Sequence, residues 1–130
     1  MSSRSLDELR PEFRSMVDLW LSDMALSNLD CLITCTLRSG PEQDALYASG
    51  RSIEGPIRTR ARAGQSAHQY GLALDFVILD SGKADWSGDS PPWNHAISLA
   101  EIRGMHSLRP FESAHLEHPE WHEIAGRTQV

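Results

Sequence analysis

A histidine, an aspartate and a second histidine could together form one metal site in this chain. His68 and Asp75 lie seven residues apart with Gly71 between them, and Glu112 precedes His115 by three residues. Three protein ligands with an open fourth position are the arrangement of a catalytic zinc ion. The carboxylate of Glu112 is then left over, and we expect it to act as a general base.

The chain has to reverse its direction between the first two of these residues. In one extended strand His68 and Asp75 would lie about 23 Å apart, whereas two ligands of one zinc ion each lie about 2 Å from it. Glycine adopts the backbone angles that a sharp bend requires. The sequence therefore predicts a bend at Tyr70-Gly71.

An alternating pattern follows the bend. One face carries Leu72, Leu74, Phe76 and Ile78, and the other carries Ala73, Asp75, Val77 and Leu79. This alternation predicts a buried strand with one charge on it. A buried carboxylate is costly unless it is paired or bound to a metal. From this strand alone, hydrogen bonds from nearby backbone donors explain Asp75 as well as a metal does.

The segment Ser66–Asp75 reads Ser-x-His-x-x-Gly-x-Ala-x-Asp. It resembles the first signature of the zinc-dependent peptidoglycan peptidases, which include D-alanyl-D-alanine carboxypeptidases and dipeptidases and phage L-alanyl-D-glutamate peptidase endolysins. The resemblance covers residues 30–80 and 108–121, and the upstream part is similar to the endolysin branch. Phe111–Glu117 resembles the closing segment of the family, although the endolysin branch often has aspartate where this chain has Glu112.

The resemblance implies a fold and a set of residue roles. The expected fold is a small single α+β domain, an antiparallel sheet with helices packed on it, like that of hedgehog domains and D-Ala-D-Ala peptidases. Residues 1–130 would be one zinc peptidase catalytic domain with no separate wall-binding module. The expected roles are Zn²⁺ binding by His68, Asp75 and His115, proton transfer by Glu112, oxyanion stabilisation by Arg38, and substrate binding or support by Gln43 and Ser66.

The resemblance also implies a function, with alternatives. The favoured one is a zinc metallopeptidase that cuts peptidoglycan stem peptides, a phage-type endolysin acting on the L-alanyl-D-glutamate bond. A D-alanyl-D-alanine carboxypeptidase or dipeptidase is the alternative within the same enzyme class. The other alternative is a non-catalytic zinc-binding module of the same fold. We expect a monomer that is made in the cytoplasm and acts on the cell wall or in the periplasm.

Composition and charge argue against two classes of binding partner, nucleic acids and membranes. The 130 residues carry a net charge of −6, which argues against binding of nucleic acid. No apolar run reaches the roughly 20 residues that span a bilayer, and the first residues lack the apolar core of a signal peptide. A local cluster of arginines precedes His68, and it is either a solvated loop or a cationic rim for substrate carboxylates: Arg51, Arg58, Arg60 and Arg62.

Other residues compete for the metal. His118 and His122 lie four residues apart, but Pro119 disfavours a helix that begins at His118, so we favour His115. Cys31 and Cys35 fall in one expected strand, too far apart for a disulfide, and are expected to be buried free thiols.

The expected elements follow from periodicity and punctuation. A helix begins at Pro11, and a turn through Ser113-Ala114 is expected to bring Glu112 and His115 to one face. The remaining expectations are strands at 31–37, 72–80 and 115–117, helices at 41–49 and 93–103, and loops at 51–65 and 81–92.

Overall fold

A computed structural model describes residues 3–59, 61 and 64–128. Arg60 and Arg62 of the arginine cluster lie outside these residues. The elements, in chain order, are η1 (Leu6–Glu8), α1 (Pro11–Leu26), β1 (Asp30–Cys35), α2 (Gly40–Ala48), η2 (Ala67–Tyr70), β2 (Ala73–Asp80), β3 (Lys83–Asp85), α3 (Pro91–Ile102), β4 (His106–Leu108), β5 (Glu112–Glu117) and α4 (Trp121–Thr128).

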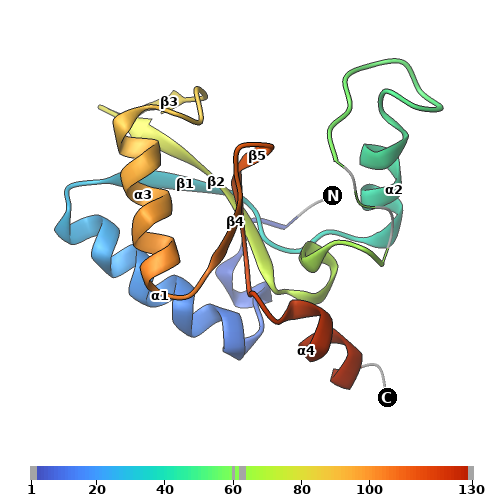
Figure 1. Cartoon of the computed structure of the whole chain (residues 1–130), viewed down its shortest axis with the longest axis horizontal. Helices are drawn as coiled ribbons and strands as arrows, with labels where there is room; N and C mark the ends of the chain where they lie inside the picture. Colours follow the sequence, from blue (N-terminus) through green and yellow to red (C-terminus); the bar gives the residue numbers. More distant parts are fainter. Residues whose placement is uncertain (1–2, 60, 62–63, 129–130) are drawn as a thin grey trace.

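The strands form one antiparallel sheet in the order β1-β2-β5-β4, with β3 paired to β2 outside this path. Helices α1 and α3 lie together on one side of the sheet, whereas α2 and the loop after it lie at the opposite end of the molecule (Figure 1). The expected α+β architecture with an antiparallel sheet is confirmed.

The core lies between the sheet and the two long helices. The ring of Phe76 on β2 contacts Trp20 of α1 and Trp93 of α3, with ring centroids 5.1 Å and 4.8 Å away. Leu74 and Ile78 are also buried, which places the predicted apolar face of this strand against the helices. Because successive residues of a strand point to opposite faces, Asp75 points to the other side of the sheet.

Four elements differ from the sequence expectations. The loop expected over 81–92 contains the short strand β3, and β4 and α4 were not anticipated. The closing strand begins at Glu112 and not near His115, so the expected turn through Ser113-Ala114 is wrong. Among the described residues, no helix combines the length and the apolar character that crossing a bilayer requires.

Candidate active site

The bend between His68 and Asp75 lies where the sequence predicted it. His68 belongs to η2, whose N-cap Ser66 accepts a hydrogen bond from the His68 backbone N–H at 3.3 Å. The helix ends at Gly71, which has φ of 70°. A Cβ atom at this position would lie 2.7 Å from the carbonyl oxygen of Glu8. The bend therefore requires glycine both for its backbone angle and for its packing.

Asp75 stands between the two histidines. Its Oδ1 lies 3.0 Å from Nε2 of His68 and 3.4 Å from Nδ1 of His115. The second contact follows from strand pairing, because Asp75 on β2 is directly opposite His115 on β5. Burial would raise the pKa of Asp75, but the charge of His68 and the hydrogen bonds from both histidines outweigh it and lower that pKa. Two ring nitrogens and a carboxylate oxygen thus converge on one point.

The outer nitrogen of each histidine is held by a hydrogen-bond acceptor. Nδ1 of His68 lies 3.1 Å from the carbonyl oxygen of Thr36, and Nε2 of His115 lies 2.7 Å from Oε1 of Glu117. Since both partners only accept, both outer nitrogens carry the hydrogen. A metal-binding histidine typically donates its other ring N–H in this way. The inner nitrogens are therefore free to bind a cation, and the donor set of His68, Asp75 and His115 fits zinc.

Without a metal, protons take the place of the cation. Burial would lower the pKa of His68, but the charge of Asp75 and hydrogen bonds outweigh burial and raise that pKa to about 10. The pKa of His115 is also raised, because hydrogen bonds to Asp75 and Glu117 outweigh its burial. The carboxylate of Asp75 thus favours the protonated form of both rings, and metal binding would release their inner protons.

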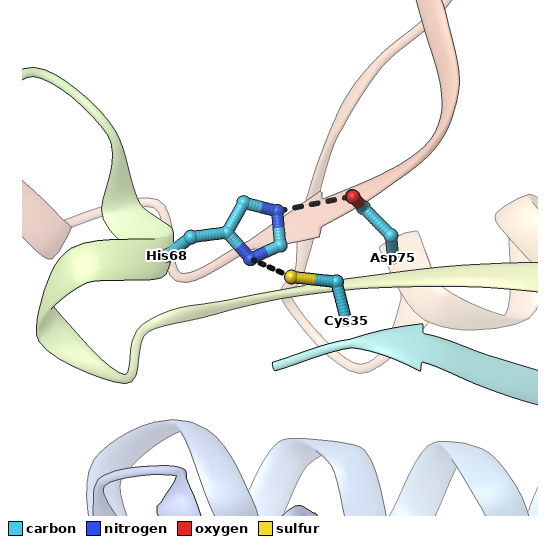
Figure 2. A group of neighbouring side chains, drawn as sticks. All are labelled: Cys35, His68 and Asp75. Carbon is cyan, nitrogen blue, oxygen red and sulfur yellow. Dashed lines mark hydrogen bonds and ion pairs between the residues drawn. The ribbon is translucent and has the colours of Figure 1, made fainter. Parts of the chain in front are cut away.

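Cys35 offers a competing ligand that the sequence reading did not connect with the site. Atoms of Cys35, His68 and Asp75 lie within 4.8 Å of one another, because Cys35 pairs with Asp75 across β1 and β2. However, the Cys35 sulfur lies 3.8 Å from Nδ1 of His68, the nitrogen that donates to Thr36. Figure 2 shows the sulfur and Asp75 at different nitrogens of the ring. A cation at Nε2 of His68 is therefore better completed by His115.

Glu112 lies beside His115 without a turn between them. Its Oε2 is 3.9 Å from Nδ1 of His115. The pairing of β4 with β5 is irregular here: Ser107 is opposite Leu116, yet the next residue, Leu108, is opposite Glu112. This irregularity, typical of a bulged strand, lets side chains three residues apart converge. Burial raises the pKa of Glu112, which suits a carboxylate that must accept a proton.

Arg38 connects the metal ligands to the rest of the site. One terminal nitrogen of its guanidinium lies 3.3 Å from Oδ2 of Asp75, and the other donates to Oε1 of Gln43 at 2.8 Å. Gln43 is fully buried, and its amide donates to the carbonyl oxygen of Ala61 at 2.6 Å. Gln43 therefore fixes the position of the Arg38 guanidinium on the side away from Asp75. Five N–H groups are available on a guanidinium, so Arg38 keeps donors for a bound substrate.

Two cavities adjoin Glu112 and His115. The first, here called the Ser66 cavity, has a volume of about 470 Å³ and is lined among others by Arg38, Ser66 and His68. The second, here called the Trp86 cavity, has a volume of about 400 Å³ and is lined among others by Asp75, Trp86 and Ser113. Phe111, Glu112 and His115 line both cavities. A long substrate could thus extend on both sides of the candidate base.

The remaining candidates lie outside the ligand cluster. His118 is buried, and its Nδ1 accepts a hydrogen bond from the backbone N–H of Glu120 at the start of α4. His122 is exposed and stacks on Trp121. Arg51 donates to backbone oxygens of Tyr47 and Thr59, and so supports its own loop.

Known proteins that resemble this chain in sequence or in structure include peptidoglycan peptidases. The chain is 38% identical over 94 residues to the peptidoglycan L-alanyl-D-glutamate endopeptidase CwlK of Bacillus subtilis strain 168. The match covers 61% of this chain. In sequence, the chain therefore resembles a peptidoglycan peptidase over part of its length. It spans 56% of the length of this relative. No protein-family model matches the chain.

Solved structures of peptidoglycan peptidases share the fold of this chain. The L-Ala D-Glu endopeptidase ChiX of Serratia marcescens aligns with a TM-score of 0.65 at 18% identity, over 95% of this chain and 92% of the other. The D,D-dipeptidase VanXYg, in complex with a D-Ala-D-Ala phosphinate analogue, aligns with a TM-score of 0.61 at 20% identity, over 94% of this chain and 55% of the other. The D-Ala-D-Ala-peptidase-like fold is therefore confirmed.

Proposed function

We propose that this chain is the catalytic domain of a zinc metallopeptidase that hydrolyses peptidoglycan stem peptides at the L-alanyl-D-glutamate bond. The observation that carries the proposal is the convergence of His68 Nε2, Asp75 Oδ1 and His115 Nδ1, with the Glu112 carboxylate 3.9 Å from the last of them. The similarity to an L-alanyl-D-glutamate endopeptidase supports this choice of bond.

Each residue has a separate task in the reaction. Zinc, when bound, would supply a Lewis acid that activates water and polarises the scissile carbonyl. Glu112 accepts the proton that water loses as its oxygen bonds to the carbonyl carbon. As the C–N bond breaks, Glu112 passes that proton to the leaving amine. Arg38 donates hydrogen bonds to the carbonyl oxygen, which gains negative charge.

The position of Glu112 argues against a purely structural metal site. A structural zinc ion is enclosed by four protein ligands. Here His68 and His115 line the Ser66 cavity and Asp75 lines the Trp86 cavity, while the carboxylate of Glu112 lies 3.9 Å from His115 as a fourth, separate group. A phage-type lysis role stays a prediction from the upstream sequence pattern.

Digestion of purified peptidoglycan fragments with the zinc-supplemented protein tests the proposal, with mass spectrometry of the new termini. We expect a new amino-terminal D-glutamate. The Glu112→Gln variant should lose about 10²–10⁴-fold in rate and still bind zinc. Glu54→Gln, in an exposed loop, should match the wild type.

The other outcomes separate the alternatives. Release of free D-alanine would assign a carboxypeptidase activity in place of the endopeptidase. Zinc binding without any cleavage would favour the non-catalytic module. Equal rates for wild type and Glu112→Gln would exclude Glu112 as the base.

A further inference from the structure

Trp86 is an exposed aromatic residue whose position packing does not explain. Its side chain is 75% exposed, although it lines a cavity that also borders Glu112 and His115. The other three tryptophans of the chain, Trp20, Trp93 and Trp121, are all buried. Large exposed apolar groups beside a concave surface often mark a binding site.

The loop that carries Trp86 is held in place on both sides. Oδ1 of Asp85 accepts from the backbone N–H of Ser87 at 2.9 Å, and its Oδ2 accepts from the hydroxyl of Ser90 at 2.6 Å. The backbone oxygen of Asp85 accepts from the indole N–H of Trp93 at 2.8 Å. These bonds fix the segment between β3 and α3, so the exposed indole is presented by an ordered loop.

The same loop packs against the strand that carries the candidate base. A Cβ atom at Gly88 would lie 3.3 Å from Cβ of Ser113, the residue that follows Glu112. The loop and the start of β5 are thus in close contact. The Trp86 cavity therefore lies next to the reacting groups and on the other side of Glu112 from Ser66.

In the proposed substrate, a sugar lies close to the scissile bond. In peptidoglycan the stem peptide begins with L-alanine, which is joined by an amide bond to the lactyl group of N-acetylmuramic acid. One alanine and one lactyl group together span about two residue lengths, roughly 7 Å. A peptidase that cuts after this alanine has to accommodate the sugar directly beside its catalytic groups.

We propose that the Trp86 cavity binds the N-acetylmuramoyl group of the substrate, with the sugar ring packed on the indole of Trp86. This inference rests on the proposed function. The apolar C–H face of a sugar ring suits the flat face of an indole. The Ser66 cavity, which contains the guanidinium of Arg38, then receives the stem peptide from D-glutamate onward, where carboxylates occur.

The test compares two substrates that differ only at the amino terminus of the stem peptide. One is the N-acetylmuramoyl stem peptide and the other is the same peptide with a free amino terminus. For Trp86→Ala, we expect the ratio of kcat/KM for the sugar-bearing peptide to that for the free peptide to fall about three- to tenfold, mainly through KM. Trp86→Phe should restore much of the ratio. Ile102→Ala, equally exposed at 75% on α3, should keep the wild-type ratio.

A binding measurement decides the inference independently of catalysis. Titration of the protein with N-acetylmuramoyl-L-alanine should change the tryptophan fluorescence of the wild type but not that of Trp86→Ala. If the wild type cleaves neither peptide, the proposed peptidase function fails and this titration still decides the sugar site. An unchanged substrate ratio in Trp86→Ala, or an equal fluorescence change in both proteins, would overturn the inference.

Discussion

Glu117 accepts a hydrogen bond from Nε2 of His115 at 2.7 Å, and the opposite nitrogen of the same ring faces Asp75. The carboxylate therefore fixes the orientation of the ring and makes the inner nitrogen a stronger electron-pair donor.

Replacing Glu117 by glutamine should weaken metal binding. Glutamine can still accept the hydrogen bond but carries no charge, so we expect zinc affinity to fall about 10–100-fold. Competition with a chelator measures the change. Glu120→Gln, at an exposed position in the same region, is the control. Equal affinities for the wild type and Glu117→Gln would show that the charge of Glu117 does not tune the site.

The choice between His115 and Cys35 as the third ligand can be settled with cobalt. We expect His115→Ala to lose most of its metal, whereas Cys35→Ser should retain it, because the sulfur faces the nitrogen of His68 that donates to Thr36. Metal analysis and the absorption spectrum of the Co²⁺ protein give the answer. A sulfur-to-cobalt charge-transfer band in the wild type that disappears in Cys35→Ser would reverse the assignment.

Gly71 and Gly82 have similar positive φ angles, but only at Gly71 would an added Cβ atom collide with a neighbour. Alanine variants of the two can therefore distinguish the stability lost through backbone strain from the stability lost through steric overlap. Gly82 has φ of 81° and no atom within 4 Å of an added Cβ, whereas at Gly71 the added atom would lie 2.7 Å from the Glu8 carbonyl oxygen. Gly82→Ala should lower the free energy of unfolding by about 1 kcal/mol, and Gly71→Ala by clearly more. Urea denaturation measures both. Since Gly71 lies between two candidate ligands, only its variant should also weaken zinc binding.

Asp85 should make the Trp86 loop sensitive to acid. The hydrogen bonds from the Ser90 side chain and from Ser87 lower the pKa of Asp85. A carboxylate whose pKa is lower in the folded state contributes stability above its unfolded pKa, about 3.9. That stability is lost as the pH falls through the folded value. The urea midpoint of the wild type should therefore fall more steeply below about pH 4 than that of Asp85→Asn. Ser90→Ala, which removes the strongest of these bonds, should show an intermediate slope; identical slopes in all three proteins would contradict the prediction.

The sequence was most informative where local rules decide the structure. Alternation identified β2 and both of its faces, and the spacing argument placed the bend at Gly71. Contacts that depend on which strands pair could not be predicted from the sequence. Cys35 meets Asp75 because β1 pairs with β2, and Glu112 meets His115 because the β4–β5 register is irregular. Neither relationship leaves a pattern within a single segment.

Short elements were missed for different reasons. Strand β3 has three residues of mostly polar character, too few for a period to be recognised. Helix α4 begins at Trp121, after Pro119, so no helix begins at His118, as expected. The ring of His118 accepts the backbone N–H of Glu120 just before the helix. The buried residues Trp121, Ile124 and Ala125 have helical spacing, and that signal could have revealed the helix.

Asp75 has the packed residues Leu74 and Phe76 as its immediate neighbours on β2, and their side chains point to the opposite face of the sheet. Substitutions at Leu74 or Phe76 can consequently change the thermal tolerance of this protein, whereas substitutions at Asp75 change the chemistry of the candidate site. A single strand thus gives the two properties separate routes of change.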